Sequence, residues 1–206
     1  MTMASLWAFL AVSFLVIATP GPDTALTVRN TLIGGRRGGG FTALGIAAGQ
    51  AIWALGTSLG LVALLMASEM VFEAVRWLGA AYLLYLGAAS LWSAWRGRAM
   101  RREIGVVQTR LTPAAAFRQG LLSDLGNPKM AVFFSSMLPQ FADDFAGLVL
   151  HGLLFGAMTL LWLTGYACVL SRAGDYLRRG PVGRLIEAAT GAALVALGLR
   201  LASEQR

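Results

Sequence analysis

The sequence predicts an all-α integral membrane protein whose six transmembrane helices form two inverted three-helix repeats, with helices 1 and 4 interrupted by proline motifs. The first indication is composition, because 57% of the 206 residues are hydrophobic and only 13% are charged. A soluble domain of this length carries roughly a quarter of its residues charged. Two further indications are a series of long apolar stretches and a proline motif that recurs three stretches later.

The apolar stretches are each bounded by glycine, proline or charged residues. A hydrocarbon core about 30 Å thick needs about 20 helical residues per crossing, so six crossings use most of the chain. Backbone groups in lipid must be satisfied within their own segment, which favours helices. The predicted helices cover residues 4–28, 41–67, 71–95, 114–140, 146–171 and 182–202. The first stretch is interpreted as a retained helix, with cleavage as a signal peptide the alternative.

These helices account for a single transmembrane transporter domain over residues 1–206. Repeat 1 covers about residues 1–95, and repeat 2 covers about residues 114–206. A basic cytoplasmic loop over about residues 96–113 joins them.

The connections alternate in charge. Basic residues follow the first, third and fifth helices, with Arg118 just inside the fourth: Arg29, Arg36, Arg37, Arg96, Arg98, Arg101, Arg102, Arg110, Arg118, Arg172, Arg178, Arg179 and Arg184. The other two connections contain Glu69 and Glu73 with Arg76, and Asp143 with Asp144. The positive-inside rule places the basic connections in the cytoplasm and both termini in the periplasm. The net charge of +7 therefore indicates topology in a bacterial inner membrane rather than nucleic-acid binding.

The two proline motifs lie inside apolar stretches. Helix 1 contains Thr19-Pro20-Gly21-Pro22-Asp23, and helix 4 contains Gly126-Asn127-Pro128-Lys129. Proline removes a backbone donor and clashes with the preceding turn, so it frees carbonyl groups inside the membrane. Broken helices of this kind present their ends to substrates and ions in transporters. A kink tolerated for packing is the simpler alternative at each site.

Three charged residues also fall at membrane depth, where an unpaired charge costs about 2.5 to 3.5 kcal/mol. We expect Asp23 and Lys129 to approach each other, and Asp124 is an alternative partner for Lys129. A desolvated carboxyl group there can carry a proton at physiological pH. A purely structural buried ion pair is the competing interpretation.

Asn30, Gln50 and Asn127 add neutral groups that can hold amino and carboxyl groups, although contacts between helices explain each of them equally well. The predicted substrate and ion pathway consists of Pro20, Gly21, Pro22, Asp23, Asn30, Gln50, Asp124, Asn127, Pro128 and Lys129.

Other function classes have little support in the sequence. Cys168 is the single cysteine and His151 the single histidine, so we expect no enzyme activity, no metal site and no cofactor. A membrane electron carrier on a similar six-helix repeat would need a cysteine pair at the helix breaks. A structural or assembly membrane protein remains the other alternative, but it gives no account of the paired breaks.

Further motifs carry a family resemblance that covers essentially the whole chain. Besides Ala18-Thr19-Pro20-Gly21-Pro22-Asp23, they are Gly79-Ala80-Ala81-Tyr82-Leu83-Leu84-Tyr85-Leu86-Gly87, Phe117-Arg118-Gln119-Gly120, Asn127-Pro128-Lys129 and Leu138-Pro139-Gln140-Phe141. With these motifs the sequence resembles the LysE/RhtB family of amino-acid exporters, the LysE-type translocators. Members often carry asparagine at the position of Asp23.

The resemblance implies efflux of amino acids or their derivatives by secondary active antiport with protons. It also implies a homodimer or other small oligomer in the lipid bilayer. The expected partners are therefore a small amino-acid-like molecule and protons, with no nucleic acid.

Overall fold

The computed structural model describes residues 3–60, 68–103, 111–172 and 180–203. Throughout these ranges the regular structure is helical. The elements are α1 (Met3–Ala18), α2 (Pro22–Ser58), α4 (Glu69–Glu103), α5 (Pro113–Leu125), α6 (Pro128–Val132), a π-helical turn (Phe133–Met137), a 3-10 turn (Leu138–Gln140), α7 (Phe145–Arg172) and α9 (Gly180–Ser203). The all-helical class predicted from the sequence is confirmed.

The first predicted interruption is present between α1 and α2. α1 ends at Ala18, and α2 begins at Pro22 after an extended Gly21. The two helices are bent by 56° at this break. Pro22 occupies the first helical position. A backbone N–H at this position has no intrahelical acceptor, so the lack of one in proline costs no hydrogen bond.

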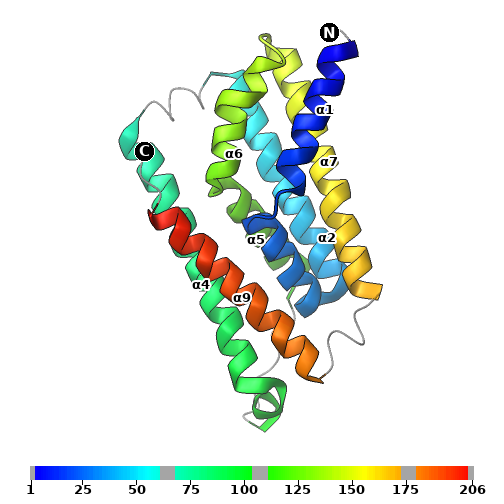
Figure 1. The fold of residues 1–206 in the computed structure, drawn as a ribbon, viewed down its shortest axis with the longest axis vertical. Helices are drawn as coiled ribbons and strands as arrows, with labels where there is room; N and C mark the ends of the chain where they lie inside the picture. Colours follow the sequence, from blue (N-terminus) through cyan, green and yellow to red (C-terminus); the bar gives the residue numbers. More distant parts are fainter. Residues whose placement is uncertain (1–2, 61–67, 104–110, 173–179, 204–206) are drawn as a thin grey trace.

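The second predicted interruption lies between α5 and α6. α5 ends at Leu125, Asn127 caps the next helix, and Pro128 is its first residue. Each interrupted helix thus resumes with proline at its first position. The chain also runs in opposite directions through them, because α1 descends toward its break while α5 and α6 ascend through theirs (Figure 1).

α2 differs from the prediction, which placed a connection between residues 28 and 41. The helix is continuous from Pro22 to Ser58 except at Gly35, whose φ of 67° lies in the left-handed region. Glycine adopts this conformation without a Cβ clash, so the chain turns within one residue. Arg29 and Arg37 consequently lie in helix rather than in a loop.

Other helix bounds also differ from the prediction. α4 begins at Glu69 and ends at Glu103, so Glu73 and Arg76 lie within it, as do Arg96, Arg98, Arg101 and Arg102. The charged ends continue the helix because arginine and glutamate are good helix formers. Arg110, Arg178 and Arg179 fall outside the described residues.

The helices form two groups. α4 and α9 lie side by side as a pair, and α1, α2, α5, α6 and α7 form the remaining bundle (Figure 1). Phe9, Phe133, Phe134 and Phe155 are fully buried in the bundle core. The rings of Phe133 and Phe155 stack with their centroids 4.2 Å apart.

Glycines allow α2 and α5 to approach closely. A Cβ at Gly45 would collide with the carbonyl oxygen of Phe117, and a Cβ at Gly120 would collide with that of Thr42. Backbone therefore lies against backbone on both sides of this contact. The contact holds α5 beside the second segment of α2, which is the part that follows Gly35.

Helix length and apolar composition identify Phe145–Arg172 as a candidate membrane span. The bent pair Ser5–Ala18 and Pro22–Ser58 passes the same test as one unit. Trp77–Trp92 and Ala188–Arg200 are shorter apolar helices. The six-span repeat topology remains a prediction.

Candidate functional site

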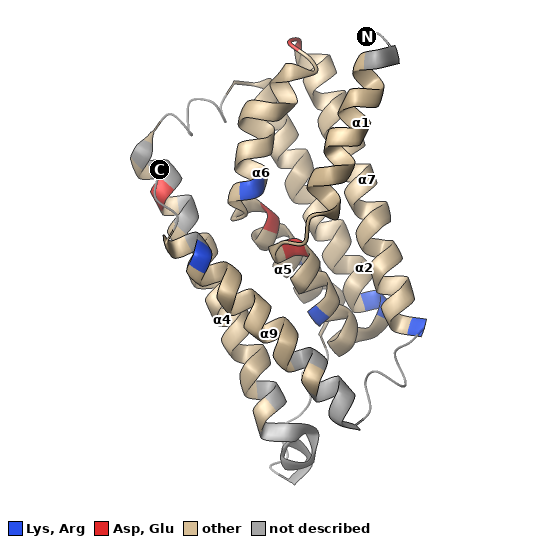
Figure 2. Ribbon diagram, in the orientation of Figure 1, with Lys and Arg blue, Asp and Glu red and all other residues tan. Residues whose placement is uncertain are grey.

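Asp23 connects the two helix breaks. It lies in the first turn of α2 and is only 7% exposed. Its Oδ1 accepts a 2.7 Å hydrogen bond from Ser123 Oγ in α5, and its Oδ2 accepts a 2.8 Å bond from Asn127 Nδ2 at the start of α6. Figure 2 shows acidic and basic ribbon beside the breaks, about half-way along the bundle.

Lys129 makes the reciprocal connection from α6 to the end of α1. Its ammonium Nζ donates to the carbonyl oxygens of Val16, at 3.0 Å, and Thr19, at 3.1 Å. These carbonyls end the first helix, where the partial negative charge of the helix dipole lies. A positive donor at this position satisfies backbone groups that the proline break leaves without intrahelical partners.

Asn127 serves both sides of this arrangement. While its amide nitrogen donates to Asp23, its Oδ1 accepts a 3.1 Å hydrogen bond from the main-chain N–H of Lys129. Asparagine is a favoured N-cap because its side chain replaces a missing backbone acceptor. One buried side chain thus starts α6 and holds it against α2.

The expected ion pair of Lys129 with Asp23 or Asp124 takes a different form. Among the described residues, Lys129 binds main-chain carbonyls and contacts neither carboxylate as an ion pair. Both aspartates nevertheless act on it electrostatically. The hydrogen-bond acceptors of the ammonium are the freed carbonyls at the end of α1, in place of the carboxylates expected from the sequence.

Asp124 lies in the last turn of α5 and is completely buried. Neither carboxyl oxygen has a hydrogen bond of good geometry within the described part of the chain. The side chain of Gln50 lies beside it, and Asp23 and Lys129 are the charged groups acting on it. Its main-chain oxygen accepts a 3.3 Å bond from Trp53 Nε1.

Gln50 and Asn30 lie in different surroundings. The buried Gln50 donates from Nε2 to Met130 Sδ at 3.6 Å, which joins α2 to α6 near the breaks. Asn30 donates instead to Thr42 Oγ1 at 2.9 Å and to Gln119 Oε1 at 3.0 Å. The structure therefore places Gln50 with the break residues, and Asn30 in a separate network.

The remaining predicted residues act through the backbone. Pro20 is exposed between the two helices, whereas Gly21 is buried. A Cβ at Gly21 would lie 3.5 Å from Lys129 Nζ, which is ordinary van der Waals contact, so Gly21 lies directly beside the ammonium group. Pro22 and Pro128 each begin a helix.

Sequence reasoning missed Ser123 as a partner of Asp23. Ser123 and Asn127 are four positions apart, and both donate to Asp23. Ser123 lies in the last turn of α5, and Asn127 caps α6 just after the break, so both donors flank the second interruption and a search for polar residues on each side of the Asn-Pro motif would have found Ser123. Gln119, the partner of Asn30, was visible only as part of a family motif.

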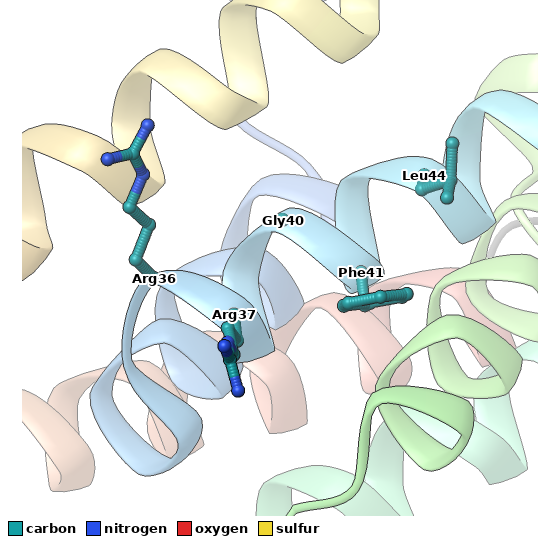
Figure 3. A pocket seen from close by; sticks show the side chains of 5 residues that line it. All are labelled: Arg36, Arg37, Gly40, Phe41 and Leu44. Carbon is teal, nitrogen blue, oxygen red and sulfur yellow. The ribbon is translucent and has the colours of Figure 1, made fainter.

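One surface feature lies apart from the breaks. A surface hollow of about 540 Å³ lies on the second segment of α2, lined by Arg36, Arg37, Gly40, Phe41 and Leu44 (Figure 3). It contains none of the predicted pathway residues.

Within the ranges described above, no group of three or more histidine, cysteine or acidic side chains could hold a metal ion.

Comparison with known proteins gives consistent matches. The family model for the LysE type translocator matches residues 14–205. An uncharacterized membrane protein of Bacillus subtilis is 28% identical over 96% of this chain and 98% of its own length. One of Pseudomonas aeruginosa is 32% identical over 96% of this chain and 94% of its own.

A leucine efflux protein of Salmonella typhimurium is 34% identical over 66% of this chain, a match that covers 63% of that relative's length. No solved structure matches.

Proposed function

Because the chain belongs to the LysE type translocator family, we propose that it is a secondary active exporter of amino acids or amino-acid derivatives, coupled to the proton gradient across the bacterial inner membrane. The relatives that are named leucine efflux proteins support this substrate class. The observation that carries the proposal is the junction of two interrupted helices through Asp23 and Lys129.

This junction suits a zwitterion. Asp23 offers a carboxylate whose two hydrogen bonds leave lone pairs for an ammonium group. Within the described ranges, the ammonium of Lys129 donates to main-chain carbonyls alone, and a substrate carboxylate can replace these acceptors. Opposite charges at the two breaks therefore match the two ends of an amino acid.

The pathway is proposed to run between the two halves of an inverted repeat with six spans. The opposite directions of the chain through the interrupted helices support this arrangement (Figure 1). Rocking of one half against the other would expose the breaks to each side in turn. We place the arginine-rich ends in the cytoplasm and both termini in the periplasm, and we propose a homodimer.

Proton coupling is energetically sufficient for export. A neutral zwitterion gains nothing from the membrane potential by itself, whereas one inward proton gains about 2.3 kcal/mol per 100 mV. At about 1.4 kcal/mol per decade, this supports roughly a fifty-fold outward gradient. One titratable group in the pathway is enough.

The test is uptake of radiolabelled amino acids, leucine first, into inverted membrane vesicles that contain the protein. We expect uptake to rise when a proton gradient is imposed and to fall to the level of empty vesicles in Lys129→Met. The matched control is Ser136→Ala, which removes an exposed hydroxyl whose one hydrogen bond in the described part of the chain is to the Val132 carbonyl. Gradient-dependent uptake of no amino acid would overturn the proposal.

A further inference from the structure

Asp124 and Gln50 form a pair of buried side chains whose hydrogen bonds are incomplete. Asp124 is 0% exposed and Gln50 is 1% exposed. Both oxygens of Asp124 and the Oε1 of Gln50 lack a hydrogen-bond partner among the described residues. Unpaired buried acceptors are costly. A proton on the Asp124 carboxyl group would turn one of these acceptors into a donor.

We infer that Asp124 is a neutral carboxylic acid that donates its proton to a hydrogen bond with Gln50 Oε1, and that this proton is the one exchanged during export. Protonation of Asp124 is a property of the folded protein alone. Exchange of this proton rests on the proposed function, and it makes Asp124 the coupling group of that exporter.

Helix position distinguishes the two buried aspartates. Asp23 lies in the first turn of α2, where the positive end of the helix dipole stabilises a carboxylate. Asp124 lies at the other end of its helix, the last turn of α5, where the partial negative charge disfavours one. The same residue type is therefore held in opposite electrostatic surroundings.

Hydrogen bonding distinguishes them in the same direction. Both oxygens of Asp23 accept bonds from side-chain donors, which suits the charged form. Asp124 has no comparable pair of donors, and a Cβ at Gly49 would lie 2.5 Å from its Oδ2. Its oxygen thus lies directly against the backbone of α2.

Charge balance supports one proton on this pair. The charged groups that face Asp124 in the described ranges are Asp23 from α2 and Lys129 from α6. With both carboxyl groups ionised, the buried cluster carries one net negative charge. With Asp124 protonated, Asp23 and Lys129 balance each other, which removes the cost of an uncompensated buried charge.

Gln50 can respond to loss of the proton by exchanging its amide oxygen and nitrogen. Its Oε1 and the carbonyl oxygen of Ala47 would each lie 3.7 Å from a Cβ on Gly156, so two acceptors face the space beside this glycine. Turning the amide brings Oε1 to the protonated Asp124 and the NH₂ group to that region. When Asp124 releases its proton, the NH₂ group turns back to donate to the carboxylate.

Infrared difference spectroscopy of the full chain in lipid vesicles tests the protonation state directly. We expect a carboxylic-acid C=O band at neutral pH that persists in Asp23→Asn and is absent from Asp124→Asn. Gln50→Leu should move the band to higher frequency by removing its hydrogen-bond acceptor. A band lost in Asp23→Asn but kept in Asp124→Asn, or no such band in the wild type, would overturn the inference, and an unmoved band in Gln50→Leu would remove Gln50 from it.

Transport assays then test the coupling role. In inverted vesicles, Asp124→Asn should abolish the rise in uptake caused by a proton gradient, whereas Ser136→Ala should retain it. Retention of the full gradient response in Asp124→Asn would refute the coupling role. If the wild type transports no amino acid, the proposed function fails together with that role, and the infrared result still decides where the proton resides.

Discussion

Asn127 donates a 2.8 Å hydrogen bond from Nδ2 to Oδ2 of Asp23, a residue 104 positions away. The bond joins the first turn of α2, which follows one helix break, to the N-cap of α6, which follows the other. The two breaks are therefore one structural unit, and the predictions below test its parts.

Replacing Asn127 with alanine should destabilise the protein by about 1 to 3 kcal/mol, because a buried carboxylate oxygen loses a donor and α6 loses its cap. Thermal unfolding in detergent measures the effect. Ser136→Ala, in the adjoining turn, serves as the control and should unfold as the wild type does. Equal stability of both variants would contradict the structural role of Asn127.

Lys129→Met should reduce both stability and export, since it leaves the carbonyls of Val16 and Thr19 without their donor. The loss of a hydrogen bond to a charged group predicts about 1.5 to 3 kcal/mol of destabilisation. Lys129→Arg keeps a positive donor and should retain more of both properties. Thermal unfolding and vesicle uptake report the two effects separately, and an unaltered Lys129→Met protein would disprove this role.

Asp23→Asn should raise the KM for a zwitterionic substrate by about tenfold to a hundredfold, because a charged acceptor for the ammonium group becomes neutral. The response of uptake to the proton gradient should remain, since the preceding inference assigns the proton to Asp124. Initial rates at several substrate concentrations, with and without the gradient, separate these effects. An unchanged KM accompanied by a lost gradient response would reverse the roles of the two aspartates.

Gly45→Ala should destabilise the contact between α2 and α5 by about 1 to 3 kcal/mol or more, because the new Cβ collides with the carbonyl oxygen of Phe117. Gly40→Ala in the same helix is the matched control, since a Cβ there meets no atom within 4 Å. Comparison of their unfolding temperatures checks the prediction. Equal unfolding temperatures for Gly45→Ala and Gly40→Ala would show that the prediction is wrong.

Several features were predictable from the sequence because they depend on local chemistry. Proline cannot continue a helix without losing a hydrogen bond, so Pro22 and Pro128 located both breaks. The connection predicted between residues 28 and 41 is reduced to a turn at Gly35, because the arginine-rich sequence beside that glycine ends an apolar stretch without ending a helix. Polarity marks the limit of a hydrophobic segment, whereas only lost backbone hydrogen bonds mark the limit of a helix.

The chain order of apolar stretches, the interrupted helices and the family motifs are properties of the sequence itself, because each follows from residues close together in the chain. The partners of the buried charges were decided only by tertiary structure. Lys129 binds the carbonyls of Val16 and Thr19, and Ser123 joins Asn127 on Asp23, since these contacts depend on how segments 100 or more positions apart in the chain pack. Charge alone indicates that a buried group needs a partner, but the distance and direction of available donors and acceptors select it.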